Sequence, residues 1–213
     1  MSVERASGII LRTRPLTETS LIVQWLTPAF GRIATVAKGA RRPKSPFRGK
    51  LDIFFSADFS FQRSQRSELH QLREVMLRDS HGSLRQDVDR LREAAYAAAL
   101  IEQSTETDTP LPGLFRLMNE WLDHLGRNSS GAPAIFAFEI KLLDELGLLP
   151  DFAAANLSAG AKQILAHGAQ DSWETVTRLK LSPAQHREIR QFLHGFLIYH
   201  LGRIPAGRPG TVS

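Results

Sequence analysis

The sequence contains no cysteine among its 213 residues. Disulfide bonds, thiolate zinc sites, iron–sulfur clusters and a cysteine nucleophile are therefore excluded. Long hydrophobic runs are also absent, because the longest apolar stretch is the eight residues 94–101, whereas a membrane-spanning helix needs about 20. The start, MSVERASGII, has no apolar run of signal-peptide length. We therefore expect a cytoplasmic protein with no membrane partner.

Acidic residues are missing from one part of the chain. The net charge is +5, but residues 1–80 carry 14 Lys/Arg against 7 Asp/Glu, and residues 81–213 carry 13 against 15. Between Gly31 and Leu51 there is no acid at all, and the basic residues there are Arg32, Lys38, Arg41, Arg42, Lys44, Arg48 and Lys50. Clustered like charges repel each other, whereas a polyanion gains from them by releasing its counterions. The pattern favours contact with nucleic acid over a loop that serves only solubility.

The first 80 residues have the texture of short strands separated by turn residues. The predicted strands are residues 7–13, 19–27, 31–38, 50–62 and 67–77. The fourth alternates with period two, so Ala57, Phe59 and Phe61 share one face while Phe54 lies on the other with polar neighbours. The fifth strand is ambiguous, because its composition also suits a helix. Five short strands in this length predict an OB-fold barrel, the five-stranded oligonucleotide-binding fold.

Helical periodicity replaces the strand texture after Asp79. The predicted helices are residues 84–103, 114–125, 134–149, 159–167 and 182–201, the last opened by Ser182 as N-cap and Pro183. The fold class is therefore α+β multidomain: an N-terminal OB-fold β-barrel (residues 1–80) followed by an all-helical C-terminal domain (residues 81–213). The Pro/Gly-rich tail, residues 203–213, is expected to be flexible.

Motifs for catalysis are weak or absent. Residues 39–45, GARRPKS, end in Lys-Ser but lack the glycine spacing of a P-loop, and no HExxH or GxSxG occurs. Asp52 and Asp58 leave open a metal-dependent nuclease. Two aromatic residues, Phe47 in the basic run and Phe54, could stack on bases or pack internally. Arg14 could extend the basic surface.

Two stretches carry a resemblance to a known family: residues 30–45, FGRIATVAKGARRPKS, and residues 138–152, FEIKLLDELGLLPDF. With the order of barrel, basic loop and helices, they resemble the RecO family of bacterial recombination mediators. The resemblance implies a non-enzymatic protein of the nucleoid that binds single- and double-stranded DNA and anneals complementary strands. It implies that RecR and the C-terminal tail of SSB, the single-stranded-DNA-binding protein, are partners, and that the protein helps to load RecA onto SSB-coated DNA.

The resemblance also assigns residues. Its basic loop corresponds to Lys38, Arg41, Arg42 and Lys44, with Arg32, Arg48 and Lys50 next in order. For the acidic, Phe-ended tail of SSB it points to the helix at residues 138–149. An apolar pocket of Phe138, Leu142 and Leu146 with a cation from Lys141, Arg116 or Arg127 would suit such a tail, and ordinary core is the competing interpretation of these apolar residues.

The chain departs from the family in one respect. Many members carry a four-cysteine zinc site just after the segment that matches LGLLPDF, where this chain reads AAANLSAGAK, residues 153–162. Neither zinc nor any other cofactor is therefore expected, and that region has to be held by packing. An RNA- or ribosome-binding module remains an alternative, because an OB-type barrel alone would allow it.

Overall fold

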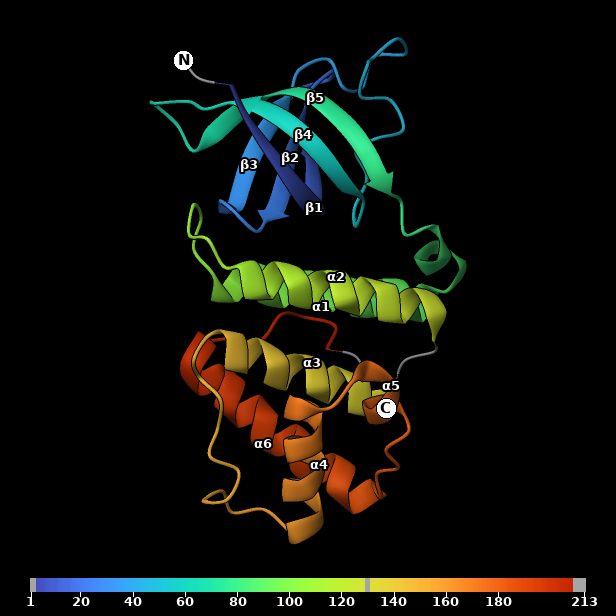
Figure 1. Cartoon of the computed structure of the whole chain (residues 1–213), viewed down its shortest axis with the longest axis vertical. Coiled ribbons are helices and arrows are strands. Elements are labelled where there is room, and N and C mark those ends of the chain that lie inside the picture. Colours follow the sequence, from blue (N-terminus) through green and yellow to red (C-terminus); the bar gives the residue numbers. More distant parts are fainter. Residues whose placement is uncertain (1–2, 129–130, 209–213) are drawn as a thin grey trace. The chain divides into compact units, whose positions relative to one another are not determined.

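The computed structural model describes residues 3–128 and 131–208 (Figure 1). These residues form two compact units. The barrel unit contains residues 3–86 and 105–122, and the helical unit contains residues 87–104, 123–128 and 131–208. The barrel unit therefore runs past the expected boundary at residue 80 and also takes up a later segment of the chain.

The barrel unit is a closed five-stranded barrel, as the sequence predicts. Its strands are β1 (Val3–Pro15), β2 (Leu21–Thr27), β3 (Gly31–Ala37), β4 (Ser56–Gln62) and β5 (Leu69–Asp79). Their order around the barrel is β1-β2-β3-β5-β4, with β3 and β5 parallel and the other pairs antiparallel. This is an OB-like arrangement, which confirms the predicted fold class and the strand at β5.

Aromatic side chains fill the barrel. Trp25 is fully buried, stacks on Phe59 with ring centroids 4.0 Å apart, and donates from Nε1 to Thr35 Oγ1 at 2.8 Å. Phe59 and Phe61 point inward from β4, together with Ala57. The period-two pattern of β4 is therefore confirmed over these residues, and a buried polar Trp nitrogen is satisfied within the core.

The fourth strand is shorter than the sequence suggests, and this changes the position of Phe54. β4 begins at Ser56, and Phe54 adopts a left-handed backbone conformation with φ of +65°. Its backbone N–H donates to Ile10 O at 2.7 Å, and its side chain is 1% exposed. The prediction that Phe54 lies on an exposed strand face is wrong, because the turn rotates its ring into the interior.

The remaining described chain is mainly helical. A 3₁₀ turn, η1 (Gly82–Gln86), precedes α1 (Val88–Ser104), α2 (Pro112–Arg127), α3 (Ala132–Glu145), α4 (Ala159–Gln170), α5 (Trp173–Thr177) and α6 (Pro183–Leu201). A capping box at Ser182 and Gln185 opens α6, which confirms the predicted start. No helix within the described residues is long and apolar enough to cross a membrane.

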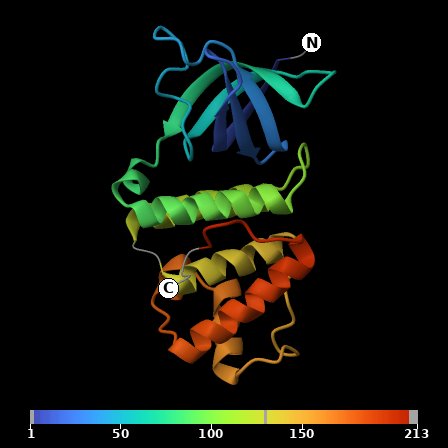
Figure 2. The ribbon, with the colours of Figure 1, turned by 180° about the vertical axis from the view of Figure 1, so that it is seen from behind.

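The helical unit is built around α3. This helix is buried on nearly all sides and packs against α4, α5 and α6, and Figure 2 shows α6 passing beside α3 and α4. Ile140 of α3 belongs to a cluster with Leu165 of α4 and Leu193 of α6. The apolar stripe that the sequence places on α3 is therefore the core of this unit.

Candidate nucleic-acid interface

The basic run forms the connection from β3 to β4, residues 38–55, here called the basic loop (Figure 1). Its backbone folds as successive tight turns, in which several amides donate to the carbonyl three residues earlier. The donors are Arg42, Ser45, Arg48 and Lys50, at 3.0–3.2 Å. Gly39 and Gly49 have φ of +68° and +71°, the left-handed conformation that glycine adopts without strain. The loop is thus compact although it has no regular helix or strand.

Phe47 anchors the middle of this loop. Its side chain is 7% exposed and joins the barrel core, so the prediction that it stacks on bases is not compatible with its position. Fully burying such a side chain stabilises a protein by about 1.5–3 kcal/mol. The ring therefore fixes the loop on the barrel, and the neighbouring cations are left on the outside.

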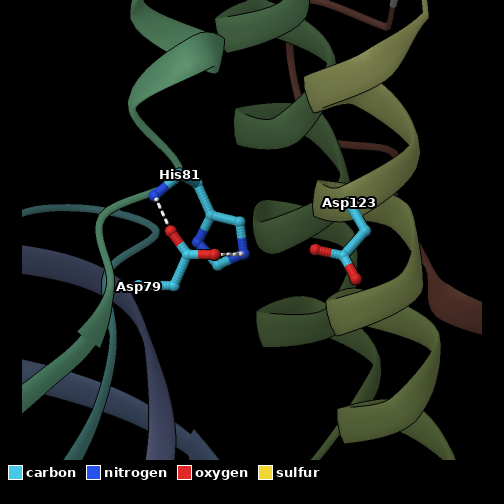
Figure 3. Close-up of side chains that lie close together, drawn as sticks. All are labelled: Asp79, His81 and Asp123. Atoms are coloured by element: carbon cyan, nitrogen blue, oxygen red, sulfur yellow. Dashed lines mark hydrogen bonds and ion pairs between the residues drawn. The ribbon is translucent and has the colours of Figure 1, made fainter.

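Hydrogen bonds hold both ends of the basic loop. At its start, Arg41 N donates to Thr19 O at 3.0 Å. At its end, the carbonyl oxygen of Phe54 lies 2.7 Å from His81 Nδ1, which must carry a proton because a carbonyl only accepts. His81 is itself held by its backbone N–H, which donates to Asp79 Oδ1 at 2.7 Å (Figure 3). Hydrogen bonds to the barrel unit therefore fix the position of both ends of the basic loop.

The cations of the basic loop face solvent without acidic partners. Five side chains are exposed and one is half-buried: Lys38, Arg41, Arg42, Lys44 and Arg48, with Lys50 the half-buried one. None of the six forms an ion pair with a carboxylate in the described part of the chain. Asp52, the acid within the loop, pairs instead with Arg85 at 2.9 Å. The positive field of the loop is therefore available to an external anion.

A second basic region lies beside the β4–β5 connection. There a groove of about 580 Å³ is lined by residues that include Lys38, Arg63, Arg66 and His70, and also Leu16 of the β1–β2 connection. In OB-folds these two connections and the β2–β3 face bind oligonucleotides. Sequence reasoning missed Arg63 and Arg66, although their place in the β4–β5 connection of an OB-fold was a usable signal.

Two contacts fix this second region. Arg63 bridges Glu4 and Asp108 at 3.0 and 3.1 Å, so part of its charge is neutralised. Ser64 N donates to His70 Nδ1 at 3.3 Å. Burial, followed by the Arg63 charge, lowers the pKa of His70. The ring therefore stays neutral near pH 7 and keeps accepting this bond, while Arg66 remains exposed.

Two further predicted DNA contacts differ in their availability. Arg14 is exposed on β1. Arg32 is half-buried, and its Nε donates to Thr105 Oγ1 at 2.7 Å while the guanidinium also bonds to Thr105 O. Asp108 N donates to Arg32 O at 2.9 Å. Arg32 therefore connects the segment at residues 105–109 to β3 by hydrogen bonds. Its guanidinium is engaged in these bonds, which corrects the prediction that it contacts DNA.

Two of the six residues predicted to bind the SSB tail are buried. Phe138 and Leu142 are fully buried in the core of the helical unit, because α3 is enclosed on nearly every side. Lys141 Nζ donates to Ala169 O and Asp171 O at 3.1 and 3.0 Å. The prediction of an exposed apolar pocket formed by Phe138, Leu142 and Leu146 is therefore wrong, because two of its three residues are buried. Leu146 is half-buried, and Arg116 and Arg127 are exposed.

A buried ionic network closes the helical unit. Glu139 of α3 is fully buried and accepts from Tyr96 at 2.6 Å and from Arg208 Nε at 2.7 Å. Burial, followed by the nearby Glu139, raises the pKa of Tyr96, so its hydroxyl stays protonated and donates. Arg208 is 7% exposed, although it lies in the tail expected to be flexible. Residues 209–213 of that tail lie outside the described residues.

Hydrogen bonds, and not packing alone, hold residues 153–162, the region for which the sequence predicts packing without a metal. Ser158 caps α4, and its Oγ donates to Glu188 at 2.6 Å while Lys162 Nζ donates to Ala153 O at 2.6 Å. Ala161 of α4 is fully buried in the core cluster of the helical unit. Without cysteine the residues present do not fit a thiolate metal site.

The two acids considered for a nuclease are each neutralised by a different arginine. Asp58 accepts from Arg78 Nε at 2.6 Å and from Ser7 at 2.7 Å. The Arg78 bond, then the Ser7 bond, lowers the pKa of Asp58. Asp52 is held by Arg85. Within the described residues, neither acid belongs to a group of three potential metal ligands. The geometry gives a nuclease no support.

Comparison with known proteins agrees with this architecture. Residues 1–81 match the family model described as Recombination protein O N terminal, and residues 85–156 match Recombination protein O C terminal. The chain is 30% identical to DNA repair protein RecO of Bacillus pumilus, over 94% of this chain and 80% of the relative. It is 28% identical to DNA repair protein RecO of Anaeromyxobacter dehalogenans, over 98% of this chain and 95% of the relative. It is 29% identical to DNA repair protein RecO of Exiguobacterium sibiricum, over 99% of this chain and 84% of the relative.

Proposed function

The chain belongs to the RecO family of DNA repair proteins, and we propose that it binds single- and double-stranded DNA and anneals complementary strands. One observation supports this most: the exposed cations of the basic loop have no carboxylate partners among the described residues. Each cation that neutralises a phosphate releases condensed counterions. Two strands that would repel each other can then approach and pair on one positive surface.

The mechanism needs no catalytic residue and no nucleotide cofactor. Sequence-tolerant binding follows, because the loop offers charge rather than an ordered set of groups for base edges. Arg41, Arg42 and Lys44 are the proposed main contacts, with Lys38, Arg48, Lys50 and Arg14 extending the surface. Arg66, which borders the groove, joins this set.

We propose the same partners that the family resemblance implies. The protein would act with RecR to load RecA onto DNA coated by SSB. The tail of SSB is acidic and would be bound by the helical unit, where Arg127 is exposed and Leu146 is half-buried. These two residues replace the buried pocket as candidate contacts.

An annealing assay tests the proposal directly. Two complementary labelled oligonucleotides, each coated with SSB, are mixed with wild type or with the triple variant Arg41→Ala/Arg42→Ala/Lys44→Ala. A second triple variant removes the same charge from exposed cations of the helical unit: Arg178→Ala/Lys180→Ala/Arg187→Ala. We expect annealing that weakens with salt, is lost in the first variant and persists in the second.

Three outcomes would contradict the proposal. Wild type that fails to anneal at any salt concentration would remove the annealing function. Preference for a structured RNA over single-stranded DNA of equal length would favour the RNA-binding alternative. Equal loss of annealing in both triple variants would show that net charge, and not the basic loop, drives the reaction.

A further inference from the structure

The basic loop lines a small, partly open cavity on the barrel. Its volume is about 380 Å³, within the roughly 300–1,000 Å³ typical of small-ligand sites. Its apolar wall is formed by Leu21, Ala40, Phe47 and Leu51. A Cβ placed on Gly49, which also lines the cavity, would meet no atom within 4 Å, so there is open space beside the backbone there.

Three arginines line the same cavity: Arg41, Arg42 and Arg48. Arg41 Nη1 donates to Thr17 O and Arg48 Nη1 to Pro43 O, both at 3.3 Å. Both contacts are with neutral carbonyls, so neither guanidinium is neutralised. Among the residues that the structure describes, no carboxylate lines the cavity. The cavity therefore combines an apolar wall with uncompensated positive charge.

A nucleotide has the matching chemistry. Its base has flat faces that pack against apolar side chains and stack on guanidinium planes, and its phosphates are anionic. We propose that this cavity receives one unpaired base of a bound strand while the three arginines hold the flanking phosphates. The inference rests on the proposed DNA binding and adds to it a base-binding subsite. A base held there would be exposed to a second strand only after it leaves the cavity.

The test compares two ligands of equal charge. One is a short oligo(dT), and the other is an oligomer of the same length in which every nucleotide is abasic. Loss of the bases leaves phosphate contacts in place, so only base contacts change the affinity. For wild type we expect dT to bind roughly tenfold more tightly than the abasic oligomer.

A matched pair of variants tests whether the preference for dT depends on this cavity. Ala40→Phe fills the cavity without removing a cation, and Ala6→Phe adds the same side chain to a separate cavity of about 590 Å³ near Asp58 and Met76. Both alanines are half-buried. We expect Ala40→Phe to lose most of the preference for dT while it binds the abasic oligomer as wild type does. Ala6→Phe should keep the preference, and circular dichroism checks that both variants fold.

The outcomes separate this inference from the proposed function. Wild type that binds both oligomers tightly and equally overturns the base subsite but leaves DNA binding intact. Displacement of the abasic oligomer from such a protein by an acidic peptide with an apolar end would assign the cavity to a peptide instead. Wild type that binds neither oligomer overturns both proposals.

A second measurement uses wild type alone and does not depend on any variant folding. An oligonucleotide that carries 5-iodouracil is bound to the protein and irradiated, and the crosslinked peptide is identified. We expect crosslinks within residues 40–51, which hold most of the cavity wall. Crosslinks confined to other segments would overturn the inference.

Discussion

Glu93 provides a quantitative test of the helical unit. It lies on α1, is 7% exposed, and its Oε2 atom has no hydrogen-bond partner within the described residues. Burial, reinforced by the charges of Asp89 and Asp87, raises the pKa of Glu93 from 4.5 to about 7. The carboxyl is therefore protonated in the folded protein at pH values where the unfolded chain has already released the proton.

The sign and size of the effect follow from this difference. Between about pH 4.5 and 7 the folded state binds the extra proton, so the free energy of unfolding falls as pH rises. A pKa difference of about 2.5 corresponds to about 3 kcal/mol, at roughly 1.4 kcal/mol for each pH unit. Glu93→Gln keeps the shape of the neutral acid and never ionises. It should stabilise the protein by about 3 kcal/mol at pH 8.5 and by almost nothing at pH 4.5.

Urea unfolding, followed by tryptophan fluorescence at both pH values, measures this difference. Glu106→Gln removes a carboxylate that is exposed, and serves as the control that should leave the stability unchanged. Coincident unfolding curves of wild type and Glu93→Gln at pH 8.5 would refute the reasoning. A gain that is equal at both pH values would also refute it, because the effect would then not come from ionisation.

Three other substitutions test the frame of the fold, each by thermal or urea unfolding. Gly31→Ala would place a Cβ 1.9 Å from Thr109 O, and the φ of +63° would strain the alanine backbone. This variant should lose about 2 kcal/mol or more of unfolding free energy. Unchanged stability would show that the segment at residues 105–109 is not held against Gly31. Arg208→Ala leaves Glu139 buried without its ion partner and should cost about 3–5 kcal/mol, partly recovered by adding Glu139→Gln. Phe47→Ala should cost about 3–5 kcal/mol; full stability with lost DNA binding would instead indicate a stacking role.

The barrel was predictable because its signals are local. Alternation in β4 identifies the inward residues, and turn residues separate the strands. The start of α6 was predictable for the same reason. The signal for a helix N-terminus lies in neighbouring residues, here Ser182 as N-cap and Pro183. The exposed cations of the basic loop also follow from the sequence, because a run of charges without acids has no internal partners.

The sequence predictions were wrong where residues far away in the chain determine the position of a side chain. Arg32 is held by Thr105, 73 residues later in the chain, and no local pattern shows that partner. Phe54 is buried because the chain turns before β4, whereas the alternating pattern continues through the turn. On α3, an apolar stripe fits both a binding surface and a core, and only the packing of α4 and α6 distinguishes them.

The salt dependence of DNA binding tests the central claim most directly. For single strands, the slope of log K against log salt concentration is about −0.7 for each phosphate neutralised. If Arg41, Arg42 and Lys44 each contact one phosphate, their replacement by alanine should make the slope shallower by about 2. The helical-unit triple variant should keep the wild-type slope. A basic-loop variant with the wild-type slope would show that these cations do not contact the strand and would contradict the account.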